Sequence, residues 1–383
     1  MRIAVNIVRV FVGVLFIISG LVKANDPLGL AYKMEEFFEV WNASLQASSF
    51  FAKNFLIGSF SFLHEHSLTL SVFMIGLEII AGVALLIGWS RSFILNLLLI
   101  LIIFFTFLTA YAFLSGKFKN CGCFGDCLPI SPITSFGKDV LLLVLIIFLL
   151  INQHYIQPFF RRRRGTFVLI LSLLFTIFIQ WYVLTYLPVA DCLPFKKGNN
   201  IAEQMKMPAN AVQDSFAMKF IYEKSGKRFE FSPEELPGDL ATYKFIDREE
   251  KLVRKGNAEP PIKGFALSGL EGTDFTQQVL AEPKSILVFA LNFNDVNNWL
   301  DRFKQVYVVA KSKRIPVFVV ASEAAKGKIL FSGAGLPEVV FLNCDYTVVK
   351  TAARTNPTFY LLEAGTVRQK WSAEKTDAFL SKL

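Results

Sequence analysis

Charged residues are scarce in this chain. Asp, Glu, Lys and Arg make up 19% of its 383 residues, whereas soluble globular proteins average about 25%, and 53% of the residues are hydrophobic. The scarcity is uneven, because residues 1–190 carry 21 charged side chains and residues 191–383 carry 50. A disordered chain, a collagen-like chain and a purely soluble enzyme are therefore excluded, and the first half has the composition of a membrane protein.

Dense basic tracts, which mark many nucleic-acid-binding surfaces, are also few. The net charge of +9 is spread along the whole chain. The one dense cluster, Arg161 to Arg164, lies between two apolar runs, which is typical of a loop beside a membrane. We therefore expect no nucleic-acid partner.

Cysteine and histidine, the usual metal ligands, number only five and three. The cysteines are Cys121, Cys123, Cys127, Cys192 and Cys344. The first pair is separated by one residue, whereas structural zinc sites usually place two to four residues between paired cysteines. His64 and His66 have no cysteine near them in the sequence. We therefore expect no metal site.

Five segments are long and apolar enough to span a membrane, which takes roughly 20 residues. They are residues 5–22, 68–88, 92–114, 140–155 and 166–189. Arg9 and Glu78 interrupt the first two, and the other three contain no charged residue. A cleaved signal peptide is the alternative for the first segment, but no clear small-x-small cleavage site precedes Lys23.

The charges of the loops predict the orientation of these spans. Arg2, Arg9, Arg91 and the Arg161–Arg164 cluster fall on one side, which should be cytoplasmic. Residues 23–66, on the other side, carry three lysines against five acidic residues. We therefore expect a multi-pass protein of a bacterial inner membrane, with its N-terminus in the cytoplasm and its C-terminal part in the periplasm. All five cysteines then lie on or beside the oxidising face.

The segment between the first two spans reads as more than a linker. Residues 30–41 predict an amphipathic helix with Phe37, Phe38 and Trp41 on its apolar flank. Such a helix lies in the outer membrane interface or packs against the top of the bundle, and we favour packing.

After residue 191 the pattern changes to strands and turns. Residues 216–223 and 227–231 flank a Ser-Gly turn and predict a hairpin, and residues 243–247 and 251–253 suggest a second one. An alternating α/β unit follows the Pro-Pro pair at 260–261. Its expected strands are 285–290, 316–321, 338–343, 358–363 and 367–371, with helices at 296–311, 324–331 and 373–383.

Three short stretches make the first half resemble known membrane families. SGLVKANDPLG at residues 19–29 and GLEIIAG at 76–82 resemble the DoxX family, and NCGCFGD at 120–126 resembles the neighbouring MauE family. The whole chain looks like the Bacteroidetes-type DoxX proteins with an extracytoplasmic thioredoxin-like tail. The resemblance implies a four-helix bundle plus one further span and, for the MauE relatives, a role in making disulfides in an envelope enzyme.

The last unit resembles thioredoxin at Thr355-Asn356-Pro357-Thr358-Phe359, where that family has a cis-proline before a strand. The resemblance implies that an extended peptide docks along Asn356, Pro357 and Thr358. The chain departs from the family at the place of the Cys-x-x-Cys pair, which here reads Asn-Phe-Asn-Asp-Val at residues 292–296. Without paired thiols, this unit cannot run dithiol exchange by the usual route.

The expected fold is therefore an α-helical membrane bundle, DoxX-like with four helices plus a fifth span, followed by a small β-rich segment and an α/β thioredoxin-like domain. The expected domains are residues 1–156 (bundle, with a cysteine loop at 117–138), 157–190 (cytoplasmic arginine loop and fifth span), 191–262 (extracytoplasmic β-rich linker domain) and 263–383 (thioredoxin-like domain).

Three charged residues near the bundle are candidates for function. Glu78 lies mid-span, where a charge costs at least roughly 2.5–3.5 kcal/mol and is usually paired or functional. It is either a proton carrier coupled to redox chemistry or a structural group bound to Asn96 or Lys23. Lys23 and Asp26 end the first span, and they could pair with each other or with Asp126 and Asp139. A snorkelling lysine and a turn-forming aspartate are the structural alternative.

Cys121 and Cys123 are the candidate catalytic pair. A Cys-x-Cys disulfide closes a small strained ring, and strain makes the bond easier to reduce. Lys117 and Lys119 would favour the thiolate by lowering the cysteine pKa. Cys127 would resolve a mixed disulfide. The alternative is a structural disulfide, Cys123–Cys127 or Cys127–Cys192, that closes the loop over the bundle, and Cys344 reads as a buried inert thiol.

Two functions follow from these residues. The first is thiol–disulfide redox or disulfide maturation of envelope proteins, which would make the protein a thiol–disulfide oxidoreductase. The second is a non-catalytic accessory subunit, or a docking or chaperone module, of an envelope export or assembly complex. Either way the partners are the lipid bilayer and other envelope or membrane proteins. A quinone would suit the bundle as electron acceptor, although no residue pattern specifies its site.

Overall fold

The computed structural model describes residues 1–116, 118, 125, 127, 130–209, 211–212, 215–224, 226–233, 235–254, 256, 258–381 and 383. Among them, five helices are long and apolar enough to span a membrane: α1 (Arg2–Ala24), α4 (Ser67–Ile87), α5 (Arg91–Ser115), α6 (Pro132–Ile151) and α7 (Arg162–Tyr186). The prediction of five spans is confirmed, and the chain is a multi-pass membrane protein.

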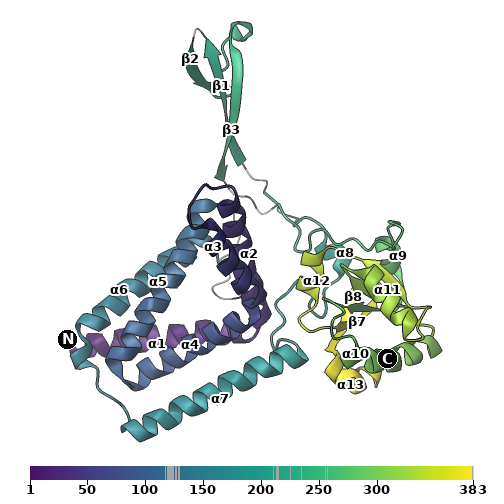
Figure 1. Cartoon of the computed structure of the whole chain (residues 1–383), viewed down its shortest axis with the longest axis horizontal. Helices are drawn as coiled ribbons and strands as arrows, with labels where there is room; N and C mark the ends of the chain where they lie inside the picture. The colour runs from purple at the N-terminus through teal and green to yellow at the C-terminus, as the bar shows by residue number, and fades with distance from the viewer. Residues whose placement is uncertain are drawn as a thin grey trace.

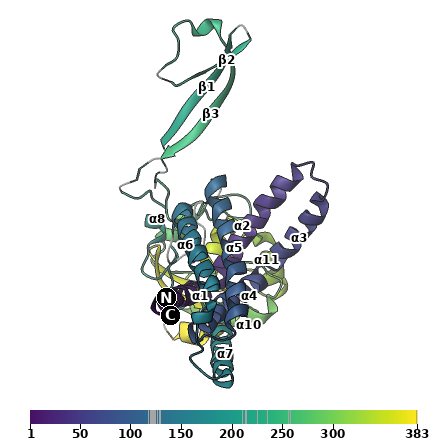
Figure 2. The ribbon, with the colours of Figure 1, turned by 90° about the vertical axis from the view of Figure 1, so that its left-hand side faces the viewer.

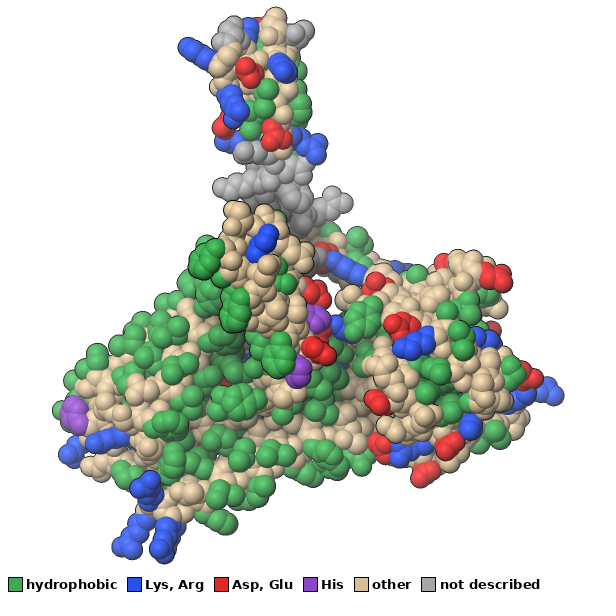
Figure 3. All heavy atoms as spheres, in the orientation of Figure 1, with side chains coloured by type: hydrophobic (Ala, Val, Ile, Leu, Met, Phe, Trp, Pro, Cys, Tyr) green, Lys and Arg blue, Asp and Glu red, His purple; other side chains and the backbone are tan. Residues whose placement is uncertain are grey.

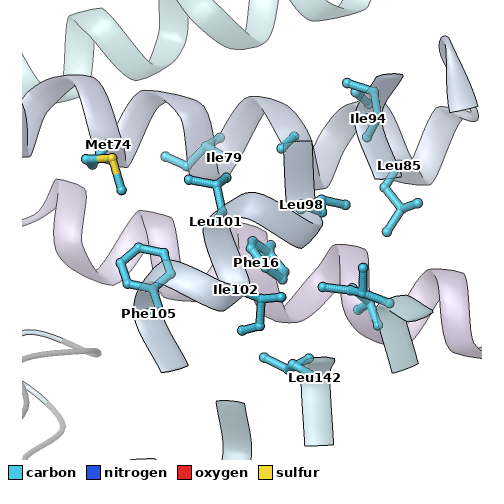
Figure 4. Close-up of a cluster of buried hydrophobic side chains, with 14 of the residues drawn as sticks. Phe16, Met74, Ile79, Leu85, Ile94, Leu98, Leu101, Ile102, Phe105 and Leu142 are labelled. Atoms are coloured by element: carbon cyan, nitrogen blue, oxygen red, sulfur yellow. The ribbon is translucent and has the colours of Figure 1, made fainter. Parts of the chain in front are cut away.

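The bundle core lies where α1, α4, α5 and α6 meet. Figure 4 shows Phe16, Ile79, Ile102 and Leu142, one from each of these four helices, turned towards this core. Helix α1 packs closely along α4, since neither Gly13 nor Gly82 has a side chain to hold the two backbones apart. A Cβ atom added at Gly82 would lie only 2.9 Å from the Gly13 carbonyl oxygen. Helix α7 packs against α4 at the side of the bundle (Figure 1).

Charged side chains inside the spans bind polar groups. The Arg9 guanidinium donates to the carbonyl oxygens of Leu85, Leu86 and Gln157, at the end of α4 and in the link to α7. These bonds satisfy its donors, so a buried cation is tolerated close to the end of a span.

The fourth span begins earlier than the expected residue 140. Helix α6 starts at Pro132, whose missing N–H suits a first helical position, and the Ser131 hydroxyl caps it by accepting from the Thr134 N–H. Asp139 is 1% exposed, forms an ion pair with Lys138 and accepts from the Thr109 hydroxyl at 3.1 Å. Because this carboxylate is paired, the helix continues through Lys138 and Asp139. The hydropathy pattern predicts instead that the span begins only after these charges.

A helical hairpin of α2 (Pro27–Gln46) and α3 (Lys53–Glu65) projects from the bundle between α1 and α4 (Figures 1 and 2). The predicted helix at 30–41 is confirmed within α2, which buries Phe37 and Phe38. Helix α3, all of which is described, buries none of its residues, and Phe55 is 75% exposed. The hairpin therefore packs on the bundle mainly through α2, and α3 adds the partly buried Phe60 and Leu63.

A three-stranded antiparallel sheet forms an arm that points away from the rest of the chain (Figures 1 and 2). Its strands are β1 (Ser215–Lys224), β2 (Lys227–Phe231) and β3 (Lys244–Arg254), in the order β2-β1-β3. The first predicted hairpin is confirmed. The second is wrong, because residues 244–254 form one strand that pairs with β1 along its length, and no glycine or proline breaks it.

The C-terminal α/β unit (residues 258–383) is built on a mixed sheet in the order β6-β5-β4-β7-β8, in which β4, β5 and β6 are parallel and β7 and β8 antiparallel to their neighbours. Its strands are β4 (Ser285–Phe289), β5 (Val317–Ala321), β6 (Val340–Asn343), β7 (Thr358–Glu363) and β8 (Thr366–Ser372). All five strands were expected from the sequence, and each lies within two residues of its expected bounds.

Helices cover both faces of this sheet. One core contains residues of α10 (Asn297–Ser312), α11 (Ala324–Gly333) and α13 (Thr376–Leu380), and the other contains residues of α8 (Ile201–Gln204), α9 (Thr276–Ala281) and α12 (Tyr346–Ala352). Phe195 and Ile201 belong to the second core. The predicted domain boundaries stay predictions, but this packing favours assigning the segment around Phe195 and Ile201 to the α/β unit.

The orientation of the spans can be tested with reporters. Basic side chains gather at the end of the bundle away from the C-terminal unit (Figure 3), and by the positive-inside rule we predict that this end is cytoplasmic. We expect a phosphatase fused after Leu383 to be active outside the membrane, and one fused in the loop at Arg161 to be inactive. If only the fusion at Arg161 is active, the spans have the opposite orientation and the prediction is wrong.

The close approach of α1 and α4 predicts different effects at two glycines of the same helix. Gly82→Leu should lower the thermal unfolding midpoint of the detergent-solubilised protein, because its Cβ would collide with the Gly13 backbone and overpacking costs about 1–3 kcal/mol. Gly76→Leu is the matched control, since a Cβ there meets nothing within 4 Å. Equal shifts of the midpoint would refute this packing.

Candidate functional site

The end of α1 contacts three different parts of the molecule. Lys23 points into the bundle, Asn25 binds the segment that follows α7, and Asp26 binds the C-terminal unit. These three residues lie within four positions of the sequence, in the stretch that prompted the DoxX resemblance. The candidate site is built around them.

Lys23 forms a buried ion pair with Glu78. Its Nζ lies 2.6 Å from Glu78 Oε2 and 4.5 Å from the centroid of the Phe105 ring, and both charged residues are at most 3% exposed. The Lys23 alternative for Glu78 is therefore confirmed, whereas Asn96 donates to the Ser92 carbonyl instead. The expected Lys23–Asp26 pairing is wrong.

A second ion pair lies beside the first. Lys138–Asp139 and Lys23–Glu78 line one small cavity of about 20 Å³ together with Ser19. This volume is enough for about one water molecule with polar partners around it. The arrangement can hold a proton-exchanging water inside the bundle. Asp126, another predicted partner, lies outside the described residues.

A disulfide lies beside Asn25. Cys127 bonds to Cys192, so one of the two structural pairings left open by the sequence is confirmed, and Cys127 is not a free resolving thiol in this structure. Cys192 is exposed and Cys127 is half-buried. The Asn25 amide lies 3.9 Å from Cys127 Sγ. Cys121 and Cys123 lie outside the described residues, so their pairing stays a prediction.

Asn25 also holds the backbone next to this disulfide. Its Nδ2 donates to the Ala190 carbonyl at 2.8 Å, and its Oδ1 accepts from the Ala190 N–H at 2.9 Å. The side-chain amide thus binds both backbone groups of one residue, as a neighbouring strand would, and fixes the segment that leads to Cys192.

Asp26 joins the bundle to the C-terminal unit. Its Oδ2 accepts from Arg354 Nε at 2.9 Å, and the arginine, which follows α12, is 3% exposed. Lys350 Nζ lies 2.5 Å from Glu35 Oε2 of α2. The Tyr32 ring stacks under both cations, 4.6 Å from Lys350 Nζ and 5.4 Å from the Arg354 guanidinium carbon, and burial raises the pKa of its hydroxyl.

A second ionic contact holds the segment after α7 on the sheet. Asp191 Oδ2 lies 3.0 Å from Nζ of Lys370 on β8, and this ammonium group is 5.2 Å from the Tyr360 ring centroid. Burial lowers the pKa of Lys370, although Asp191 acts in the opposite direction. Three successive residues therefore bind three different parts of the molecule. Ala190 binds Asn25 at the end of α1, Asp191 binds the C-terminal unit, and Cys192 binds Cys127 of the cysteine loop.

The predicted peptide-docking residues lie on the loop before β7. The Asn356–Pro357 bond is cis, as expected. Asn356 accepts from the Leu291 N–H at 3.0 Å and donates to the Asn292 carbonyl at 3.0 Å, where the Cys-x-x-Cys pair is missing. Pro357 and Thr358 are buried, so Asn356 is the most accessible of the three. Peptide docking stays a hypothesis.

Cys344 lies in the C-terminal unit, away from the disulfide. Cys344 follows β6, is 7% exposed and forms no disulfide, and burial raises the pKa of its thiol to about 11. The expected burial of this thiol is confirmed, and its inertness stays a prediction. Within the described part of the C-terminal unit, no other thiol is present.

Sequence reasoning missed the residues that dock the C-terminal unit. Arg354, Lys350, Lys370 and Asp191 lie in ordinary mixed sequence, and no spacing rule links residue 26 to residue 354. The only available signal was the position of Arg354, a charged residue directly before a predicted buried turn and strand.

Comparisons with known proteins cover parts of this chain. Residues 1–152, which contain the first four spans, match the family described as methylamine utilisation protein MauE, and residues 216–255 match a domain of unknown function, DUF8463. The chain is 34% identical over 79 residues to Protein TlpB of Flavobacterium psychrophilum, which is 20% of this chain and 22% of that relative. No solved structure matches. The DoxX and thioredoxin-like assignments stay predictions.

The Asp26–Arg354 pair predicts how the C-terminal unit is held. Asp26→Asn keeps the cap on α2, because Asn caps as well as Asp, but removes the carboxylate charge that accepts from the buried Arg354 guanidinium. Breaking such a pair costs about 3–5 kcal/mol. We expect faster amide hydrogen exchange in α12 and at residue 354.

Glu36→Gln is the matched control, since Glu36 is 47% exposed and forms a surface pair with Lys33 within α2. It should leave exchange in α12 unchanged. If both variants exchange at the wild-type rate, Asp26 does not hold the C-terminal unit.

Proposed function

We propose that this protein is a membrane-bound thiol–disulfide exchange factor for other envelope proteins, with Cys121, Cys123, Cys127 and Cys192 as its reactive cysteines. The observation that carries the proposal is the exposed Cys127–Cys192 disulfide at the junction of bundle and C-terminal unit. The match of residues 1–152 to the MauE family and the Cys-x-Cys motif six residues before Cys127 support it.

The exchange step can be written with its electrons balanced. A client thiolate attacks the exposed sulfur of Cys192, a mixed disulfide forms, and Cys127 leaves as a thiolate. A second client thiolate then attacks the client sulfur and releases Cys192. The client has lost two electrons and two protons, which the Cys127 and Cys192 thiols now hold. Exchange with a strained Cys121–Cys123 disulfide would return this pair to the disulfide state.

The buried charges of the bundle fit the same role. Thiol oxidation releases protons, and we propose that Glu78 carries them while Lys23 and Lys138 balance its charge around the shared cavity. Asp26 positions the C-terminal unit.

For the C-terminal unit we propose a thioredoxin-like fold that binds client peptides beside Asn356, Pro357 and Thr358. The order of its strands and helices and its mixed sheet support this fold. Because the unit lacks paired thiols at residues 292–296, it would present the client to the disulfide of the bundle. The membrane is proposed to be the bacterial inner membrane, with this unit in the periplasm.

A second function has an observation of its own. The C-terminal unit is fixed to the bundle by Asp26–Arg354 and Lys350–Glu35, and Cys344 is buried. These contacts suit a rigid accessory subunit of an envelope export or assembly complex, in which Cys127–Cys192 is a structural crosslink.

Cysteine replacement separates the two functions. We expect the Cys121→Ser, Cys123→Ser double variant to raise the free-thiol content of other envelope proteins severalfold, measured by alkylation and mass spectrometry. Cys344→Ser is the control and should leave that content unchanged, because its thiol is buried. Normal client disulfides in a folded double variant would refute exchange and leave the accessory function.

A further inference from the structure

A large hollow of the membrane bundle lies away from the ion pairs. An apolar groove of about 970 Å³ runs between the α2–α3 hairpin and the spans α4 and α5. This volume is at the upper end of the range for small-molecule sites, which is about 300–1,000 Å³. The walls are hydrocarbon and aromatic, and include Leu63 of α3, Met74 of α4 and Leu101 of α5.

The groove is open to the surface that faces lipid. Ile100, Phe104 and Phe107 line it on α5 and are 64%, 38% and 56% exposed. Figure 3 shows apolar side chains covering the bundle beside the projecting hairpin. Because α5 spans the membrane, the groove is continuous with the hydrocarbon region, and its occupant must enter from the bilayer.

One end of the groove is aromatic and carries two hydrogen-bond donors. The Trp41 ring lies 5.9 Å from Tyr111 and 5.2 Å from Phe60, centroid to centroid. In the part of the chain that is described, neither the Trp41 indole N–H nor the Tyr111 hydroxyl has a side-chain hydrogen-bond partner. An acyl chain has no oxygen that could accept a hydrogen bond from these donors. A flat ring with carbonyl oxygens can stack on the aromatic side chains and accept hydrogen bonds from both donors.

The same aromatic end adjoins the start of the cysteine loop. Phe118 is 5% exposed and stacks on Phe37 at 4.2 Å, and it lies 6.1 Å from Tyr111. Cys121 follows Phe118 by three residues in the sequence. A ring bound against Trp41 and Tyr111 would therefore lie near Phe118, which comes shortly before the cysteine motif in the sequence.

We propose that this groove binds an isoprenoid quinone, with its ring against Trp41 and Tyr111 and its tail along α4 and α5. The inference rests on the proposed function, because it supplies the two-electron acceptor that net disulfide formation needs. Two thiols lose two electrons and two protons and form one disulfide, and the quinone gains both and becomes a quinol.

Binding of a menaquinone with an isoprenoid tail to the full chain in nanodiscs tests the site. We expect saturable binding that Leu97→Trp, which fills the groove, weakens at least tenfold. Leu141→Trp is the control, because Leu141 is 52% exposed on α6 and does not line the groove. Tyr111→Phe should weaken binding roughly two- to tenfold, the effect of one hydrogen bond.

Two results would overturn the quinone site. One is wild-type affinity in Leu97→Trp. The other is displacement of the menaquinone by an equal amount of a phytanyl-chain phospholipid, which has no ring and would identify a general lipid groove.

The same binding measured in the Cys121→Ser, Cys123→Ser variant separates this inference from the proposed function. Retained menaquinone binding with normal client disulfides in cells would refute exchange and leave the quinone site standing. Altered client disulfides with no saturable binding would refute the quinone site alone.

Discussion

The ion pair between Asp26 and Arg354 is the contact on which the arrangement of this protein depends. It joins residues 328 positions apart and fixes the C-terminal unit to the end of the first span. The buried arginine binds the Asp26 carboxylate and the Lys350 carbonyl oxygen, and it lies over the Tyr32 ring, so its charge is stabilised there. Without it, the α/β unit would still meet the bundle through Lys350–Glu35, the contact of Lys375 with Tyr182 of α7 and the segment after α7.

That segment explains why a disulfide at this place can have consequences beyond a crosslink. Ala190 is held by Asn25, Asp191 by the buried Lys370, and Cys192 by Cys127. Three successive residues thus bind the bundle, the C-terminal unit and the cysteine loop. Opening the disulfide would release one of three neighbouring anchors, and the other two keep Cys192 in place for a second exchange.

Local patterns predicted most of the elements. The five spans follow from the thickness of a bilayer, and the strands β4 to β8 follow from short apolar runs between turns. Where a prediction failed, a distant partner decided the outcome: β3 is one strand because β1 pairs with all of it, and α6 extends through Asp139 because Lys138 and Thr109 bind that carboxylate. Cys127 pairs with Cys192, and Asp26 with Arg354, because the fold brings segments together that are far apart in the sequence. The distance between two residues along the chain does not predict such pairs.

The thiol state of Cys127 and Cys192 in living cells tests the central claim most directly. Differential alkylation of unperturbed cells, followed by mass spectrometry, reports the fraction of each cysteine that is free, paired or bound to another protein. The exchange account predicts a measurable reduced fraction and mixed disulfides between Cys192 and envelope proteins, enriched when Cys127 is replaced by Ser. A bond that is fully oxidised, with no mixed disulfide even in that variant, would contradict the account.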